Sequence, residues 1–323
     1  MTEPVADSQA LRQRRETGWS FVAALAVMLA FFAIAPFVIY PVFLMEVLCF
    51  ALFACAFNLL IGYVGLVSFG HALYFGWASY FAAYAAKSWG WQPEFAVLIG
   101  TAAAAALGAI AGSVAIRRQG IYFAMITLAL AQMMYLVALR VKMTGGEDGI
   151  QAVPRGQLFG MFNLGNDVTM YIFVLVVVLA AFLMIYRIIN SPFGEVLKAI
   201  RENEQRAISL GYRTDRYKLV AFILSATLAG LAGSLKALVF QLASLTDVHW
   251  NMSGEVVLMT LVGGLGTVFG PVTGAFAIVA MENYFSAFGQ WVLVIQGAIF
   301  VACVLVFRRG IVGELGHALR VKL

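Results

Sequence analysis

Charged residues are scarce in this chain of 323 residues, of which only 11% are charged and 63% are hydrophobic. A soluble domain of this size cannot hide that much apolar surface, because a single core saturates and the remaining surface must face water. Hydrocarbon must therefore be the solvent for much of the surface. The net charge of +5 suits a nucleic-acid binder, but the basic residues lie mainly between apolar runs. That arrangement is typical of membrane topology, and we expect no nucleic-acid partner.

Cysteine and histidine are also rare, and their positions exclude two kinds of site. The three cysteines lie inside apolar runs, and an odd number without close pairing argues against a disulfide framework: Cys49, Cys55 and Cys303. The three histidines are far apart and have no CxxC or HExxH neighbours: His71, His249 and His317. The sequence therefore predicts neither a disulfide scaffold nor a metal site.

Apolar runs long enough to cross roughly 30 Å of hydrocarbon recur along the whole chain. We expect ten, at residues 20–40, 42–61, 69–86, 95–116, 121–139, 169–189, 217–241, 255–269, 272–288 and 291–307. The third and the eighth are rich in small residues, which also suits a short or re-entrant piece. Pro36 follows a signal-peptidase-like Ala-Ile-Ala and disfavours cleavage there, so we expect the first span to be retained. The expected fold class is an all-α, polytopic membrane protein with about eight to ten transmembrane helices.

The distribution of basic residues orients these spans. With a cytoplasmic N-terminus, alternating sides place residues 12–15, 117–118, 187–218 and 308–322 inside, and these hold 16 of the 21 Lys and Arg residues. Both termini are therefore expected in the cytoplasm. The predicted organisation is a tail at 1–19, a transmembrane domain at 20–307 and a second tail at 308–323. Within the transmembrane domain, 141–168 form a periplasmic loop and 190–216 a cytoplasmic segment.

The cytoplasmic segment does not have the composition of an ordinary loop. Ser191 before Pro192 is typical of a helix start, with a cap followed by proline at the first helical position. Apolar residues among charged ones then predict an amphipathic helix outside the bilayer, and Gly211 suits its C-terminal end. Such a helix either docks onto a protein or rests on lipid headgroups, and periodicity alone favours neither.

Four blocks in order along the chain carry a family resemblance. They are NLLIGYVGLVSFGHALYFGWASY (58–80), GIYFAMITLALAQ with TGGEDGI (120–132 and 144–150), AIRENEQRAISLGYRTDRYKLVAFILSATLAGLAGSL (199–235) and LVGGLGTVFGPVTGA (261–275). Together they resemble the M-type permease of branched-chain amino acid ABC importers, over roughly residues 48–310. Glu204, Ala207 and Gly211 stand where an importer's coupling motif has its Glu-Ala-Ala start and downstream glycine, although the Ala-Ala doublet is not intact.

The resemblance implies a permease subunit in a bacterial inner (plasma) membrane that translocates branched-chain or other hydrophobic amino acids. An H-type permease would complete the path, two ATPase subunits would dock below, and a periplasmic binding protein would deliver substrate. The residues implied in ATPase coupling are Arg201, Glu202, Glu204, Ala207 and Gly211. The chain has no G-x-x-x-x-G-K-[ST] phosphate loop, so we expect ATP on the partner and no catalysis or cofactor here.

Glycine and polar residues interrupt the apolar region at 62–71. Non-helical backbone at membrane depth survives only where protein or a water-filled cavity satisfies its polar groups, so such breaks indicate a substrate path. We therefore assign a set of five residues to the translocation path: Gly62, Gly65, Ser68, Gly70 and His71. For His71, a structural hydrogen bond to a neighbouring helix is the favoured role. Small-xxx-small spacings instead predict close helix packing: Gly108/Gly112, Gly266/Gly270 and Ala226/Gly230/Ser234.

The residues Thr144, Gly145 and Gly146 begin the outer loop and are expected at the outer mouth of the path. A glycine-rich turn at a helix end explains them equally well. Four charges within or beside the spans are expected to face a cavity, a partner or water: Glu46, Glu255, Glu282 and Lys236.

Other functions fit the sequence less well. The same architecture also serves the import of urea, amides or aromatic acids, with selectivity set largely by the separate binding protein. A stand-alone secondary carrier or channel would need coupling charges deep in the spans, and such candidates are few. An intramembrane enzyme would need paired aspartates, an HExxH or a nucleophile with its base, and the spans contain none of these.

Overall fold

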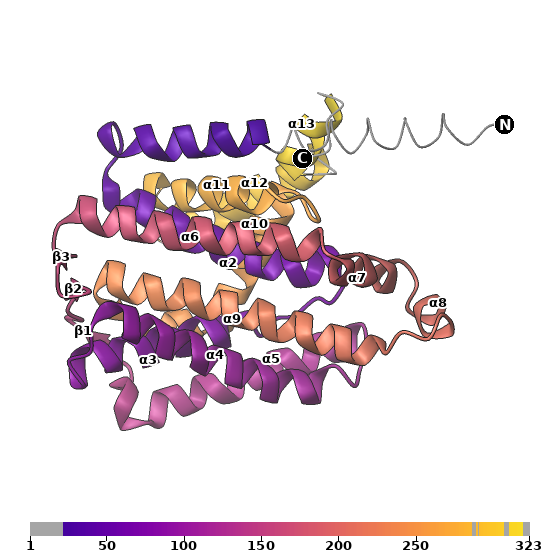
Figure 1. Ribbon diagram of the computed structural model, residues 1–323, viewed down its shortest axis with the longest axis horizontal. Helices are drawn as coiled ribbons and strands as arrows, with labels where there is room; N and C mark the ends of the chain where they lie inside the picture. Colours follow the sequence, from indigo (N-terminus) through magenta and orange to yellow (C-terminus); the bar gives the residue numbers. More distant parts are fainter. Residues whose placement is uncertain (1–21, 286–288, 290, 307–309, 319–323) are drawn as a thin grey trace.

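The structure, a computed structural model, describes residues 22–285, 289, 291–306 and 310–318. The predicted tail at 1–19 lies outside the described residues, as do 308–309 and 319–323 of the predicted C-terminal tail. Long helices lie side by side along the longest axis, with the short strands at one end and α7 and α8 at the other (Figure 1). The chain is thus an all-α protein, as predicted.

Helices account for every predicted span. They are a first apolar helix (Val22–Phe37, ending in η1, Ala35–Phe37), α2 (Pro41–Tyr63), α3 (His71–Ser88), α4 (Pro93–Ala115), α5 (Ile121–Arg140), α6 (Asp167–Ile189), α9 (Thr214–Phe240), α10 (Trp250–Gly263), α11 (Gly270–Phe285) and α12 (Trp291–Val306). Two short helices, α7 (Pro192–Glu202) and α8 (Glu204–Ser209), separate α6 from α9, and α13 (Gly310–Ala318) follows α12.

Five of the described helices are long and apolar enough to cross a membrane: α2, α4, α5, α6 and α9. The eighth predicted segment, 255–269, is wrong in its bounds, because α10 runs from Trp250 to Gly263. The side chain of His249 caps its start by accepting from the Asn251 amide, and Gly264, with φ of 124°, leaves the helical region. With 14 residues α10 is about 21 Å long, short of a full hydrocarbon span.

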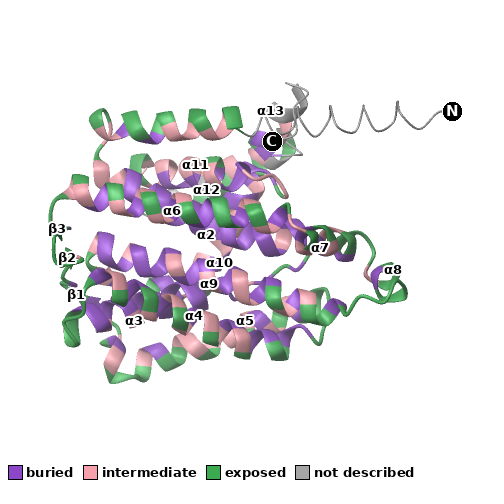
Figure 2. Ribbon diagram, viewed as in Figure 1, coloured by how far each residue is buried: buried purple, intermediate pink, exposed green. Residues whose placement is uncertain are grey.

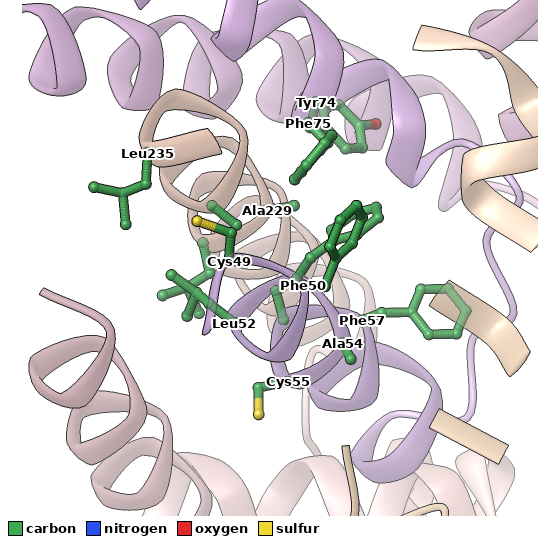
Figure 3. Close-up of a cluster of buried hydrophobic side chains, with 14 of the residues drawn as sticks. Cys49, Phe50, Leu52, Ala54, Cys55, Phe57, Tyr74, Phe75, Ala229 and Leu235 are labelled. Carbon is green, nitrogen blue, oxygen red and sulfur yellow. The ribbon is translucent and has the colours of Figure 1, made fainter. Parts of the chain in front are cut away.

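The helix α2 lies at the centre of the bundle. Its mean hydropathy is 2.3 and 89% of its most apolar stretch is buried, as expected for a helix that is apolar on all sides. It packs against α6, α9, α10 and α11. Figure 3 shows its side chains among those of α3 and α9. The rings of Phe53 in α2 and Phe75 in α3 are 4.5 Å apart. Cys49 and Cys55 are free thiols in this core.

Close packing of small residues joins α4 to α9. A Cβ added at Gly230 would overlap the Cβ of Ala104, and one at Gly108 would lie 2.5 Å from the Cβ of Ala226. The predicted packing role is confirmed for these glycines. It is wrong for Gly266, which lies in the turn between α10 and α11 with φ of +75°.

The outer sides of α4, α5 and α6 are exposed along much of their length (Figure 2). Only 22% of the most apolar stretch of α5 is buried, and the corresponding stretches of α4 and of α6 are each 39% buried. Large apolar side chains project there, among them Leu98, Ile110, Met125, Met133 and Val176. Lipid or a partner protein must cover these surfaces.

Two strand pairs and two short 3-10 turns, η2 (Lys142–Thr144) and η3 (Leu245–Val248), complete the fold at the end opposite α7 and α8. β1 (Ile150–Gln151) pairs antiparallel with β4 (Leu242–Ala243). β2 (Gln157–Leu158) pairs antiparallel with β3 (Phe162–Asn163). The predicted outer loop at 141–168 therefore lies at this end, held to the segment that follows α9.

Candidate functional site

The segment between α6 and α9 is two helices rather than the single amphipathic helix predicted. Its start is as predicted, because the Ser191 side chain accepts from the Gly194 amide at 3.3 Å and Pro192 is the first helical residue. Asn203 then breaks the helix, with φ of −158°, and caps α8 by accepting from the Arg206 amide at 3.0 Å. Asparagine is a strong N-cap, and this signal was available in the sequence. Gly211, with φ of +89°, follows the end of α8 as predicted.

Arg201, near the end of α7, contacts the end of α2. Its guanidinium donates a hydrogen bond to the carbonyl oxygen of Gly62, in the last turn of α2. Its aliphatic stem passes over Gly65, where an added Cβ would lie 3.2 Å from the Arg201 Cγ. Gly65 also has φ of +81°, so glycine is favoured there for two reasons. Two regions that the sequence assigns to different roles, coupling and path, thus touch.

Glu204, the first residue of α8, also faces inward. Its Oε1 lies 2.6 Å from the Lys218 Nζ and accepts from the Thr214 hydroxyl at 3.1 Å. Its Oε2 accepts from the Gln119 amide at 2.9 Å, in the loop between α4 and α5. The Lys218 side chain is only 2% exposed, so this is a largely buried ion pair. Glu204 therefore ties α8 to α9 and to the α4–α5 loop.

The other side of α8 is open. Ile208, Leu210 and Tyr212 are 47%, 70% and 42% exposed, whereas Ala207 is buried. Arg201 and Glu202 at the end of α7 are exposed as well. Figure 1 shows α8 beyond the ends of the long helices. Apolar side chains exposed at such a tip are the mark of a contact surface.

Asn58 of α2 holds the glycine-rich turn that joins α10 to α11. Its Nδ2 donates to the Thr267 carbonyl at 2.9 Å, and its Oδ1 accepts from the Gly266 amide at 3.0 Å. The turn lies close to the backbone of α2, because a Cβ added at Gly62 would overlap the Asn58 side-chain amide and lie 2.9 Å from the Gly266 nitrogen. Sequence reasoning missed Asn58, although an asparagine inside an apolar run was a usable signal.

The residues assigned to the path divide into two groups. Gly62 and Gly65 lie at the α2 end beside Arg201, and a pocket of about 160 Å³ lies between residues 65–67 and the start of α5. Ser68, Gly70 and His71 are buried. Gly70 packs on the Thr127 backbone of α5, and the Thr127 hydroxyl accepts from the Phe69 amide at 3.2 Å.

His71 forms a bridge among three helices. Its Nε2 lies 2.8 Å from the Ser225 hydroxyl of α9, and that hydroxyl donates to the Ala56 carbonyl of α2 at 2.5 Å. Because the serine proton is used on Ala56, the His71 Nε2 is the donor in the first bond. The ring also packs edge-on against Phe57, with centroids 5.0 Å apart. This geometry matches the favoured structural role of His71.

The residues assigned to the outer mouth lie at the end of α5. Thr144 is buried, and its hydroxyl donates to the Ala138 and Val141 carbonyls at 2.5 and 2.6 Å. Gly145 and Gly146 follow in a left-handed turn, with φ of 77° and 64°.

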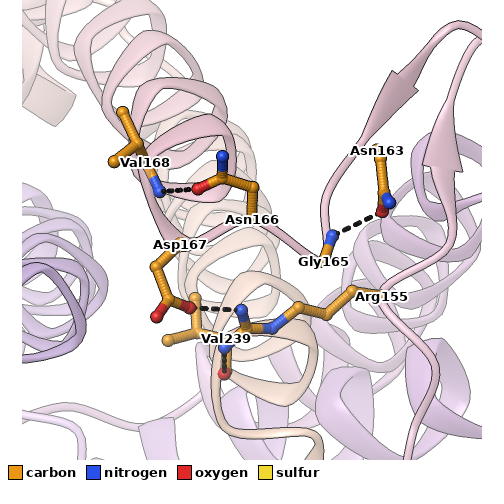
Figure 4. Close-up of polar contacts among 7 residues, drawn as sticks. All are labelled: Arg155, Asn163, Gly165, Asn166, Asp167, Val168 and Val239. Carbon is orange, nitrogen blue, oxygen red and sulfur yellow. Dashed lines mark hydrogen bonds and ion pairs between the residues drawn. The ribbon is translucent and has the colours of Figure 1, made fainter.

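A separate contact closes the outer loop. The Arg155 guanidinium donates to the Asp167 carboxylate at 2.6 Å and to the Val239 carbonyl at 2.8 Å (Figure 4). This contact joins the loop to the start of α6 and the end of α9.

The comparison with protein families decides what kind of protein carries this geometry. The family described as branched-chain amino acid transport system / permease component matches residues 39–304. This chain belongs to that family. It is therefore a multi-pass membrane permease, a subunit of an ABC importer, as the sequence blocks imply.

Several curated proteins resemble this permease. The high-affinity branched-chain amino acid transport system permease protein LivM of Escherichia coli (strain K12) is 26% identical over 288 residues, 82% of this chain and 68% of that protein. The probable branched-chain amino acid transport permease protein LivH of Methanocaldococcus jannaschii is 29% identical over 170 residues, 48% of this chain and 51% of that protein. The autoinducer 2 import system permease protein LsrC of Photorhabdus laumondii is 32% identical over 111 residues, 31% of this chain and 32% of that protein. No solved structure matches significantly.

Charges at the end of the bundle that carries the strands are partly paired. The Lys236 Nζ lies 2.7 Å from both Asp247 carboxylate oxygens, and these side chains are 11% and 2% exposed. Asp247 was missed as the partner of Lys236, because η3 lies outside the apolar runs. Glu46, Glu255 and Glu282 are partly exposed on α2, α10 and α11. Among the described residues, no group of three or more His, Cys, Asp or Glu side chains could hold a metal ion.

Proposed function

We propose that this permease imports branched-chain or other hydrophobic amino acids, with α7 and α8 as its ATPase-docking element. An H-type permease, two ATPase subunits and a periplasmic binding protein would complete the importer. The relative from E. coli supports the substrate class through the system named in its description. The same architecture importing urea, amides or aromatic acids is the alternative.

The exposed apolar tip of α8 is the observation that carries the docking proposal. Ile208, Leu210 and Tyr212 lie beyond the long helices, on a segment whose inner side is tied to the bundle by Arg201 and Glu204. A rigidly held, partly apolar tip suits insertion into a cleft of a partner protein. The basic residues of 187–218 assign this end to the cytoplasm, where ATP is available.

Docking onto a protein fits this segment better than binding to lipid headgroups as an interfacial helix. An interfacial helix needs a continuous apolar face along its length, with basic residues beside it. Here α8 has six residues, and the apolar side of α7 is already covered, since Leu197 and Ile200 are buried in the bundle. The exposed Glu202 would also be repelled by an anionic lipid surface.

Leu210→Asp tests the docking. We would co-express the permease with candidate ATPase subunits from the same genome and measure their co-purification. The variant should lose the ATPase, while Met161→Asp, at a comparably exposed apolar position at the opposite end, should retain it. Full retention by Leu210→Asp would overturn the docking element.

Uptake into proteoliposomes tests the substrate class. The assembled importer, supplied with its binding protein and ATP, should accumulate radiolabelled leucine, isoleucine or valine, and unlabelled urea, acetamide and benzoate should not compete. Competition by one of these compounds, without amino acid uptake, would favour the alternative substrate class. Amino acid uptake without ATP would indicate a stand-alone carrier.

A further inference from the structure

We propose that the turn between α10 and α11, residues 264–269, is an inner gate whose position Arg201 sets from the docking element. The proposal rests on the proposed function, since it assigns the path by which movement of α7 and α8 reaches the membrane body. In the structure described here, Arg201 is bonded to the Gly62 carbonyl beside this turn and Asn58 is bonded to the turn itself.

The turn lies beside the last turn of α2. The helix α10 begins within the bundle, since Val248, just before it, packs against Gly76 of α3, and it ends where Gly266 meets Gly62. The irregular backbone of the turn needs partners that satisfy its polar groups. Asn58 satisfies two, the Gly266 amide and the Thr267 carbonyl. The Thr267 hydroxyl donates to the Gly264 carbonyl at 2.8 Å and accepts from the Gly270 amide at 3.1 Å.

Arg201 meets the turn at the same point. Its Nη1 donates to the Gly62 carbonyl. A Cβ added at Gly266 would lie 3.2 Å from that Nη1 and 3.4 Å from the Gly62 carbonyl oxygen. The end of α2, the turn and the arginine head group are therefore in direct contact. On the other side, an added Cβ at Gly310, the first residue of α13, would overlap the Gly264 backbone.

Backbone contacts make this junction stiff. Where glycines meet, no flexible side chain can absorb a displacement, so a shift of one segment must move or release its neighbour. Arg201 is the only side chain by which α7 donates a hydrogen bond to α2 among the described hydrogen bonds. It is thus positioned to transmit a shift of α7 to the turn.

The second tie of the segment is to α9. Through Glu204, α8 holds Lys218 and Thr214 of α9 and Gln119 of the α4–α5 loop. The helix α9 packs against α3 and α4 as well as α2. The segment therefore holds both α2 and α9, and a pull on it would act on both helices. Arg201 is a positioning residue in this scheme, not a contact of the solute.

Arg201→Ala in the assembled importer tests the scheme. We expect ATP hydrolysis within about twofold of the wild type, and amino acid uptake per ATP hydrolysed at least tenfold lower. Arg201→Lys keeps the charge but loses the planar fork, and should restore part of the uptake. Lys198→Ala is the matched control, because Lys198 lies on the same helix and bonds only the exposed Glu195.

A spectroscopic readout separates transmission from mere stabilisation. A spin label on Leu265→Cys, a half-exposed position in the turn, would be placed in a background without Cys49, Cys55 and Cys303. Its spectrum should change between the nucleotide-free and the ATP–vanadate-trapped importer, and the change should disappear with Arg201→Ala or Asn58→Ala. An unchanged response in both variants, or normal uptake per ATP, would overturn the gate. A parallel fall of hydrolysis and uptake would do the same, because it would show that these residues only stabilise the fold.

Failure of the proposed function would give a different result. In that case the wild-type permease would neither bind the ATPase nor show ATP-dependent uptake, before any variant is compared.

Discussion

The Glu204 carboxylate of α8 lies 2.6 Å from the ammonium of Lys218 in α9, whose side chain is 2% exposed. The acid that begins the proposed coupling motif is therefore turned toward the permease itself. Its second oxygen is also engaged, by Gln119. In the proposed docking, contacts with an ATPase would therefore fall to the exposed residues beside it, Ile208, Leu210 and Tyr212.

Removing this carboxylate should destabilise the permease. We expect Glu204→Gln to lower stability by about 3 kcal/mol, because an almost fully buried ammonium loses its close partner. Asp215, 3.6 Å from the same ammonium but 83% exposed, offsets only part of the loss. Thermal unfolding in detergent is the measurement. Glu195→Gln, which breaks an exposed pair with Lys198, is the control and should change stability by about 1 kcal/mol or less. Equal melting temperatures for the two variants would contradict this account.

A single methyl group should disrupt the α4–α9 contact. Gly230→Ala places a Cβ on the Cβ of Ala104, so we expect a loss of about 1–3 kcal/mol despite the higher helix propensity of alanine. Gly254→Ala in α10 is the matched control, because an added Cβ there meets no atom within 4 Å. That variant should be neutral or slightly stabilising in the same assay. If both variants behaved alike, packing at Gly230 would not be the cause.

The hydrogen-bond bridge of His71 should matter for stability rather than for substrate affinity. Ser225→Ala leaves the buried His71 Nε2–H without its acceptor, which should cost about 1–3 kcal/mol. The KM for amino acid uptake should stay unchanged. Ser113→Ala, whose hydroxyl bonds only the Ile110 carbonyl of its own helix, should have little effect. A raised KM with unchanged thermal stability would instead place His71 on the path.

The two ends of the bundle should face opposite sides of the membrane. In a background without the three native cysteines, Met161→Cys should react with a membrane-impermeant maleimide in right-side-out vesicles. Ser209→Cys in α8 should react only in inside-out vesicles. Both positions are exposed, so accessibility within the protein does not limit the reaction. The reverse pattern would invert the orientation inferred from the basic residues.

Apolar runs and capping residues in the sequence predicted the positions of the long helices well, but predicted less well where helices are interrupted. Nine of the ten predicted segments agree with their helices within a few residues, because long apolar runs have one stable form in hydrocarbon. The bounds of α10 and the break at Asn203 were wrong or missed. The bounds of α10 depend on a histidine cap and on glycines with positive φ, and the break between α7 and α8 depends on an asparagine cap. Each of these single residues interrupts a stretch of sequence that otherwise favours a continuous helix.

The sequence by itself determined the membrane class, the positions of most long helices, the end that carries the basic residues and the four blocks that indicate the family. These follow from composition, periodicity and order along the chain. Only the tertiary structure showed that Arg201, Gly62 and Gly266 meet, that Asn58 holds the α10–α11 turn and that Glu204 faces Lys218. These partners are far apart in the chain, and only the packing of α2 against α10 and α11, and of α8 against α9, brings them within hydrogen-bonding distance.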